Sequence, residues 1–249
     1  MNRLVRTELR KQRSTRTFLA GIATAPVIAG LLTVAILSAA GKHGNDPLDP
    51  DNLVQVLGAP AGVITLIAIV LGVFGMAGEY RHQTITTTFL ASPRRRDVVM
   101  AKLAAHAITG AVMAVLSLTV SMAIAIPWLR SSGVDIPVGG DAIRVAAGLV
   151  VSTALHAALG VSIGALIRNQ TAAAAAVLVW LLAVEGLIGD LLGRSDFVRW
   201  FPAAAGRALV HVGPTGDNLS SPVAAAVLSA YVVVLAAAGA RLTIRRDIT

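Results

Sequence analysis

The stretch FLAGIATAPVIAGLLTVAILSAA, Phe18–Ala40, decides the fold class, because it runs for 23 residues without a charged side chain. An α-helix needs roughly 20 apolar residues to cross the hydrocarbon core of a bilayer. The rest of the chain is similar: 55% of the 249 residues are hydrophobic and 14% are charged, whereas a water-soluble domain has about a quarter charged. The mean hydropathy of +0.75 agrees with this. The sequence therefore predicts an integral membrane protein.

Five further apolar runs of membrane-spanning length follow the first. We predict an all-α polytopic protein in which residues 1–249 form a single transmembrane domain with six spans, 18–40, 53–78, 103–127, 145–167, 171–189 and 223–240. Pro60 predicts a kink or break early in the second span. Segment 190–222 is too long for a simple turn, and its aromatic residues favour the membrane–water boundary, which predicts an external re-entrant or interfacial helix.

The distribution of basic residues predicts the topology. Fifteen of the 21 Lys and Arg residues lie in segments that share one side of the membrane with both termini. Cytoplasmic loops carry the excess of Lys and Arg, so both termini and segment 79–102 are expected to be cytoplasmic. The basic residues are explained by topology and have no aromatic platform beside them, so we expect no nucleic-acid partner.

Residues 1–17 are expected to form an amphipathic helix. Met1, Leu4, Val5 and Leu9 share one helical face and basic residues occupy the rest, a pattern typical of a helix lying on the anionic lipid of the inner leaflet. A solvated charge cluster that only sets the topology is the alternative. A cleaved signal peptide is disfavoured, because the apolar run that follows is longer than the usual 7–15 residues.

The motif GVSIG, Gly160–Gly164, has two interpretations. It matches the G-x-S-x-G pattern of serine hydrolases, which would make Ser162 a nucleophile inside the membrane, but that pattern requires a strand–turn–helix context. It is also a G-x-x-x-G motif for close helix packing, and we favour this reading. The chain has no phosphate-binding loop and no cluster with metal-ligand spacing. It also lacks cysteine, so we predict no catalytic residue, metal or cofactor in this chain.

Two ionisable residues lie within predicted spans, His156 in the fourth and Glu185 in the fifth. Such residues usually face a bundle interior or a cavity. If neighbouring helices bring them together, they would form a proton or cation site. The alternative, which we favour, is a neutral hydrogen-bonding histidine in the core and a hydrated or protonated glutamate near the outer boundary.

Segment 79–102 is long for a loop that only turns the chain. It mixes threonines with apolar residues, and Pro93 cannot continue a preceding helix without disrupting it. A short helix ended by Pro93, then a basic elbow, then a helix that re-enters the membrane at Lys102 is the simplest prediction. From the residues alone, a docking site for a soluble partner and a loop that only sets the topology are equally favoured.

The run GEYRHQTITTTFLASPRRRDVVMAKL, Gly78–Leu103, resembles the first cytoplasmic loop of type-2 ABC exporter permeases, particularly the short actinobacterial kind. The residues that match the family pattern are Gly78, Glu79, Arg81, Thr84, Thr87, Pro93, Arg96 and Lys102. The resemblance extends over nearly the whole chain through the basic N-terminus, the six spans and the RRDI tail, Arg245–Ile248. Only the loop motif is specific.

The resemblance implies that two permease copies, identical or different, pair with two separate ATPase subunits that supply ATP and magnesium. The helix at about Thr84–Ser92 would couple the permease to the ATPase, with Glu79 and Arg81 anchoring its base and Thr87, Pro93, Arg96 and Lys102 completing the coupling set. The substrate path would lie between the permeases, along the second and fifth spans. Its candidate residues are Thr65, His156, Val177, Trp180 and Glu185.

The resemblance also implies a bacterial plasma membrane. A polytopic regulatory or assembly protein whose loop docks a different partner is the main alternative, and an intramembrane serine hydrolase is a third.

Overall fold

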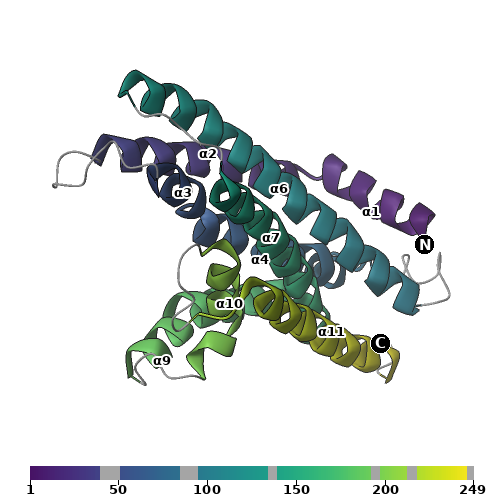
Figure 1. The fold of residues 1–249 in the computed structure, drawn as a ribbon. Helices are drawn as coiled ribbons and strands as arrows, with labels where there is room; N and C mark the ends of the chain where they lie inside the picture. Colours follow the sequence, from purple (N-terminus) through teal and green to yellow (C-terminus); the bar gives the residue numbers. More distant parts are fainter. Residues whose placement is uncertain (40–50, 85–94, 134–138, 192–196, 212–217, 246–249) are drawn as a thin grey trace.

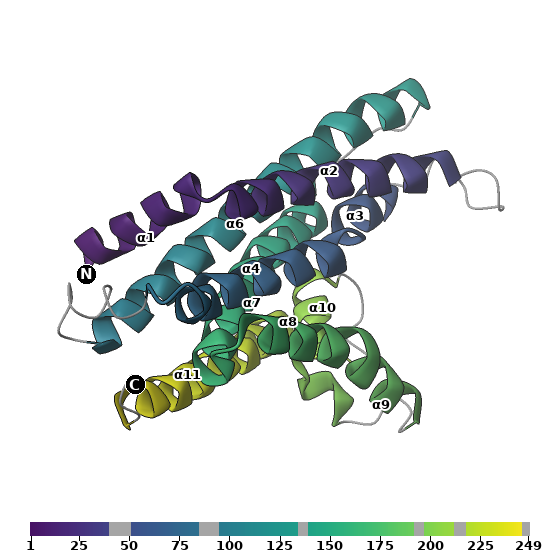
Figure 2. The same cartoon turned by 180° about the vertical axis from the view of Figure 1, so that it is seen from behind.

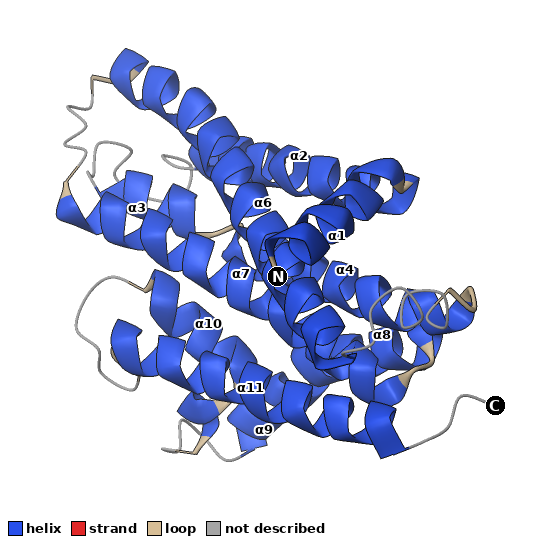
Figure 3. Ribbon diagram, turned by 90° about the vertical axis from the view of Figure 1, so that its right-hand side faces the viewer, coloured by secondary structure: helices blue, strands red, loops and turns tan. Residues whose placement is uncertain are grey.

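The computed structural model describes residues 1–39, 51–84, 95–133, 139–191, 197–211 and 218–245, and every regular element in these residues is a helix (Figures 1 and 3). The α-helices are α1 (Asn2–Ser14), α2 (Arg16–Ala39), α3 (Asp51–Gly58), α4 (Ala61–Arg81), α6 (Arg95–Ser131), α7 (Gly140–Ile167), α8 (Gln170–Val179), α9 (Glu185–Leu191), α10 (Pro202–Val210) and α11 (Ser221–Arg245). A π-helical turn, Trp180–Val184, joins α8 to α9, and a 3₁₀ turn, Val198–Trp200, precedes α10.

Six helical segments are long and apolar enough to cross a membrane, which confirms the predicted all-α class and the predicted number of spans for the described residues. They are Arg16–Ala39, Leu53–Arg81, Arg96–Ser131, Gly140–Ile167, Gln170–Gly189 and Ser221–Arg241. The chain is therefore a multi-pass membrane protein by the length and composition of its helices.

The second span is broken by a turn at Ala59 and Pro60, as the sequence predicted, because proline cannot donate the backbone hydrogen bond that a continuous helix requires. The third span differs from the prediction in its start. It begins at Arg95, so Lys102 lies inside α6 and not at its start. Asp97 in the first turn of α6 favours this earlier start, because an acidic side chain complements the positive end of the helix dipole.

Both chain termini lie at the same end of the bundle (Figures 1 and 2). We call this the terminal end; the start of α6 is also there. Helix α3, the last turns of α6 and helix α9 lie away from it, and we call that region the far end. The two ends are the landmarks for the sites described below.

Helix α7 is the centre of the bundle, where it packs against α4, α6, α10 and α11. Glycines allow these backbones to approach closely: a Cβ atom on Gly160 would lie 1.9 Å from the Ile69 carbonyl oxygen on α4, and one on Gly148 would lie 1.9 Å from the Leu209 carbonyl oxygen on α10. Small residues of this kind let membrane helices associate through van der Waals contact. At these glycines α7 therefore meets α4 and α10 backbone to backbone.

The outer faces of the bundle are apolar. Large side chains exposed on α2, α6 and α11 include Leu31, Val115 and Val233. A bilayer solvates such side chains, so their exposure agrees with a membrane-embedded bundle.

Helix α10 lies within the described part of segment 190–222. In α10, six of nine residues are buried, and the helix lies against α7 and α11.

Candidate functional site

A cluster of four charged side chains lies at the terminal end. The Lys102 ammonium of α6 donates to Glu8 Oε2 at 2.8 Å, to Glu79 Oε1 at 2.7 Å and to the Gly75 carbonyl oxygen at 3.2 Å. The Lys11 ammonium bridges the same two carboxylates, at 3.1 Å from Glu8 Oε1 and 3.0 Å from Glu79 Oε1. We call Glu8, Lys11, Glu79 and Lys102 the ion cluster; it joins α1, α4 and α6.

The ion cluster is buried on one side and exposed on the other. Lys102 is 1% exposed, so its ammonium depends on its three acceptors, whereas the Lys11 side chain is nearly half exposed. Burial alone would raise the pKa of Glu8, but the charges and hydrogen bonds of Lys102 and Lys11 outweigh it and hold that pKa below its usual range. Burial likewise opposes the charge of Lys11, and Glu79 and Glu8 together raise its pKa. Both shifts favour the charged forms of Glu8 and Lys11.

Helix α1 faces the bundle with polar residues. Glu8 and Gln12 are its buried side chains, and the Thr109 hydroxyl of α6 donates to Gln12 Oε1. Figure 2 shows α1 beside the first half of α6. Of the apolar residues on its predicted lipid face, Met1 is exposed and Leu4, Val5 and Leu9 are half-buried. The helix is amphipathic as expected, and its two fully buried side chains are polar.

The predicted coupling residues do not form one group in the structure. Glu79 and Lys102 are bonded to one another, whereas Arg81 and Arg96 are exposed at the end of α4 and in the first turn of α6. Thr84 lines a cavity beside the ion cluster. Thr87 and Pro93 lie outside the described residues, as does most of the predicted coupling helix.

Sequence reasoning missed Glu8, Lys11, Gln12 and His106. One signal was available: Glu8 is the only acidic residue in a strongly basic N-terminal segment. An isolated acid on a basic helix that precedes a membrane span is a candidate for pairing with a buried cation.

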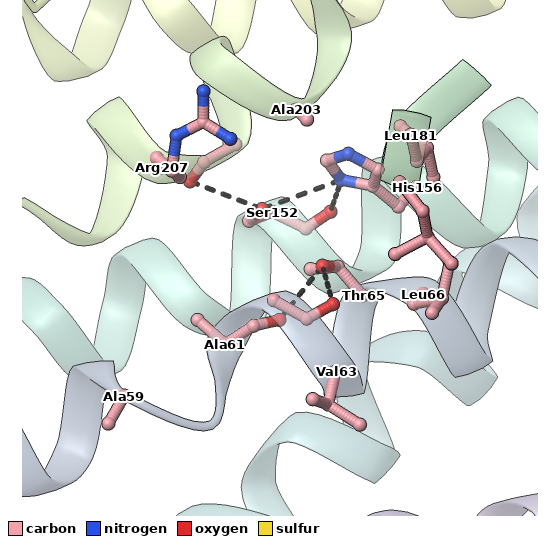
Figure 4. Close-up of a pocket in the computed structure, with 13 residues that line it drawn as sticks. Ala59, Ala61, Val63, Thr65, Leu66, Ser152, His156, Leu181, Ala203 and Arg207 are labelled. Carbon is pink, nitrogen blue, oxygen red and sulfur yellow. Dashed lines mark hydrogen bonds between the residues drawn. The ribbon is translucent and has the colours of Figure 1, made fainter. Parts of the chain in front are cut away.

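A second site lies toward the far end. A cavity of about 270 Å³ is enclosed by α4, α7, the π-helical turn and α10 (Figure 4). Thr65 from α4 and His156 from α7 line it, together with Leu181 and Leu182 from the π-helical turn and Arg207 from α10. The π-helical turn supports a functional role for this cavity, because π-bulges often occur at functional sites. The alanine-rich sequence of the fifth span did not predict this turn.

The predicted path residues lie in two groups. Thr65 and His156 line the far-end cavity, and the Thr65 hydroxyl donates to the Ala61 carbonyl oxygen at 2.8 Å. Val177 is buried in the core beside α7. Trp180 is partly exposed and donates from Nε1 to Glu185 Oε1 at 2.8 Å. Val177, Trp180 and Glu185 do not line the cavity.

His156 and Glu185 both contact α10. Both carboxylate oxygens of Glu185 accept from the Ala203 backbone N–H, at 3.1 and 3.2 Å. His156 Nδ1 lies 2.8 Å from the Ser152 carbonyl oxygen, and its ring packs against Gly206 of α10, where a Cβ atom would lie 2.7 Å from the ring atom Cε1. The two residues thus contact the same helix, and each has hydrogen-bond partners of its own.

We expect Glu185→Gln to loosen α10. The variant keeps one acceptor oxygen but loses the negative charge at the helix N-terminus, which should lower the free energy of unfolding by about 1 kcal/mol. Titration with SDS in mixed micelles, followed by tryptophan fluorescence, measures this because Trp180 shares the carboxylate. Asp141→Asn is the matched control: Asp141 lies in the first turn of α7 and is exposed. Equal losses in the two variants would contradict the capping role.

The GVSIG motif packs α7 against α4. Gly160 and Gly164 face the α4 backbone, where Cβ atoms would lie 1.9 Å from the Ile69 carbonyl oxygen and 3.0 Å from the Val73 carbonyl oxygen. The Ser162 side chain is fully buried, and its hydroxyl lies 3.1 Å from the Ala158 carbonyl oxygen and 3.2 Å from the Val232 carbonyl oxygen. The packing interpretation agrees with this geometry.

Within the described ranges, no group of three His, Asp or Glu side chains is arranged to hold a metal ion. Searches of the sequence against protein-family models and against curated proteins find no match. The resemblance to ABC permeases therefore rests on the residues of segment 78–103 and on the general plan of the chain.

Proposed function

We propose that this chain is the transmembrane permease subunit of an ATP-binding-cassette transporter of the exporter type. In this proposal two copies, or one copy and a related chain, form the pathway in a bacterial plasma membrane with both termini cytoplasmic. Two separate ATPase subunits bind ATP and magnesium and drive the permease through segment 79–102. The chain itself carries no catalytic residue.

The observation that carries the proposal is the ion cluster at the base of segment 79–102. Glu79 lies near the end of α4, where the segment begins, and Lys102 lies on α6, where the segment ends. The Lys102 ammonium is 2.7 Å from Glu79 Oε1, and Lys102 is buried. A force applied to the segment is then shared by three helices, because charge-assisted hydrogen bonds fix both of its ends. A loop that only sets topology needs no such anchoring.

Helix α4 connects this base to the far-end cavity. Gly75 and Glu79 near its end contribute to the ion cluster, and Thr65 and Leu66 nearer its start line the cavity. It packs closely against α7 at Gly72, where a Cβ atom would lie 2.1 Å from the Ala157 carbonyl oxygen. In this proposal a shift of α4 is passed on to α7 through that contact. This supports a transport role in which the cavity belongs to the substrate path.

Replacing residues 84–93 with a flexible Gly/Ser linker tests the proposal. We expect copurification of a phosphate-loop ATPase, encoded beside this chain and coexpressed with it, to fall at least about tenfold, because a flexible linker must be ordered before it can dock. Expression and helicity of the permease should be unchanged. The measurement is the ratio of ATPase to permease after affinity purification, together with ATP hydrolysis by the purified complex.

A linker of the same composition in place of residues 134–138 is the control, since that loop is predicted to face the other side of the membrane. Retention of the ATPase by the 84–93 variant, with unchanged ATP hydrolysis, would refute the coupling role. Loss of a partner that has no phosphate loop would instead favour the regulatory or assembly protein.

A further inference from the structure

A cavity of about 540 Å³ lies between the end of α4 and the turn that joins α7 to α8. Helix α8 packs against both α4 and α7, which brings these two parts of the chain together (Figure 2). The residues that line the cavity are Tyr80, Arg81, Arg168, Asn169, Gln170 and Thr171. We call it the arginine cavity.

The lining of the arginine cavity is basic. Arginine is positively charged and presents a planar fork of N–H donors that fits the oxygens of a phosphate or a carboxylate. Two of the six lining residues are arginines and none of these six is acidic. Glu79, which precedes Tyr80, is bonded to the two lysines of the ion cluster. The cavity is therefore suited to an anion.

The Tyr80 ring and the backbone both define the position of Arg168. Its guanidinium carbon lies 5.2 Å from the centroid of the Tyr80 ring, a cation–π contact. Its backbone is left-handed, with a φ of 34°, directly after the end of α7. Glycine is the usual residue at such a helix end, because other residues are strained there. A strained arginine that lines a cavity points to a role for its side chain.

The ends of the apolar helices place the arginine cavity at the boundary of the membrane. Leu53–Arg81 ends at one of the two arginines, Gly140–Ile167 ends one residue before the other, and Gln170–Gly189 begins two residues after it. Lipid head groups lie at this level, directly outside the hydrocarbon core. Basic pockets between membrane helices bind the head groups of anionic lipids, and tyrosine is enriched at the same boundary.

We propose that the arginine cavity binds the phosphate group of an anionic phospholipid, with Arg168 and Arg81 as its ligands. The two arginines require an anion, and the position of the cavity at the ends of three apolar helices selects a lipid over a soluble ion as its source. The inference goes beyond the transport function and needs no ATPase, so either can fail without the other.

The test uses the purified full chain in detergent at pH 7, with three probes. Dioleoylphosphatidylglycerol is anionic, dioleoylphosphatidylcholine has the same acyl chains and a phosphate but no net charge, and inorganic phosphate has no acyl chain. We expect a saturable rise in the unfolding temperature with phosphatidylglycerol, and its retention in native mass spectrometry, with no comparable effect of the other two. An equal effect of phosphatidylcholine or of inorganic phosphate would overturn the proposal.

Arg168→Gly tests the site itself. The change removes the guanidinium, and glycine adopts the left-handed conformation of Arg168 without steric cost, so the fold should be retained. Loss of the charge-assisted hydrogen bonds should weaken phosphatidylglycerol binding at least about tenfold. Unchanged affinity in a folded Arg168→Gly variant would contradict the assignment.

Two matched controls separate the cavity from general effects. Gln83→Gly changes the other left-handed residue that ends a helix, at a φ of 55°, without changing the charge. Arg144→Met removes one positive charge from the exposed start of α7. Both variants should bind phosphatidylglycerol as the unmodified chain does. A loss in either control equal to that in Arg168→Gly would overturn the proposal, because backbone conformation or net charge would then explain the binding.

Discussion

Replacing Lys102 with methionine is expected to destabilise the protein by about 3–5 kcal/mol, because it leaves two carboxylates buried without their main cation. Methionine keeps the length and apolar stem of the side chain, so loss of packing contributes little. Glu8 and Glu79 would retain only Lys11, which lies at the exposed rim of the ion cluster. SDS-induced unfolding in mixed micelles, followed by circular dichroism, measures the change.

The control removes a cation from an exposed pair. Arg144 Nη1 lies 3.2 Å from Asp141 Oδ1, and both side chains are more than half exposed. Arg144→Met should cost less than about 1 kcal/mol, since surface ion pairs contribute little. The double variant Glu8→Gln, Lys102→Met should recover part of the loss, because it removes one of the uncompensated charges. A single Lys102→Met variant as stable as Arg144→Met would show that the ion cluster is not a buried network.

Substituting Gly160 with alanine is expected to separate α7 from α4 and to lower the free energy of unfolding by about 3 kcal/mol, the upper part of the range for overpacked cores. The new methyl group would lie 1.9 Å from the Ile69 carbonyl oxygen and 2.9 Å from the Val73 backbone nitrogen. Backbone atoms cannot rotate away as a side chain can, so one whole helix must move. The same mixed-micelle titration measures the loss.

Gly186→Ala is the matched control, because no atom lies within 4 Å of the position that its Cβ would occupy. There the change should be neutral or stabilising by up to about 1 kcal/mol, since alanine favours a helix over glycine. Equal stability of the two variants would mean that α4 and α7 do not approach as closely as the geometry requires.

The structure gives different roles to the two motifs, GVSIG and the loop motif of segment 78–103. GVSIG is a packing motif in the fold, and its serine is buried among backbone carbonyls. The loop motif placed Glu79 and Lys102 on either side of one segment, and these two residues are bonded in the structure. The sequence did not predict that pairing, because the two residues are 23 positions apart and nothing local links them.

The sequence by itself determined that the chain is helical, how many times it can cross a membrane and where the long apolar helices lie. The reason is physical: uncharged runs of about 20 residues have few alternatives to a spanning helix, because a bilayer leaves no other way to satisfy the backbone.

The tertiary structure alone decided which helix faces meet. Helices rich in alanine and glycine present similar surfaces all round, so their sequence does not mark a contact face. Lys102 pairs with Glu8 from 94 positions earlier in the chain, and α10 folds back onto α7 where Gly148 leaves room for its backbone. Contacts of this range depend on how the packed backbones fit, and only the folded arrangement brings the ion cluster and the cavities into existence.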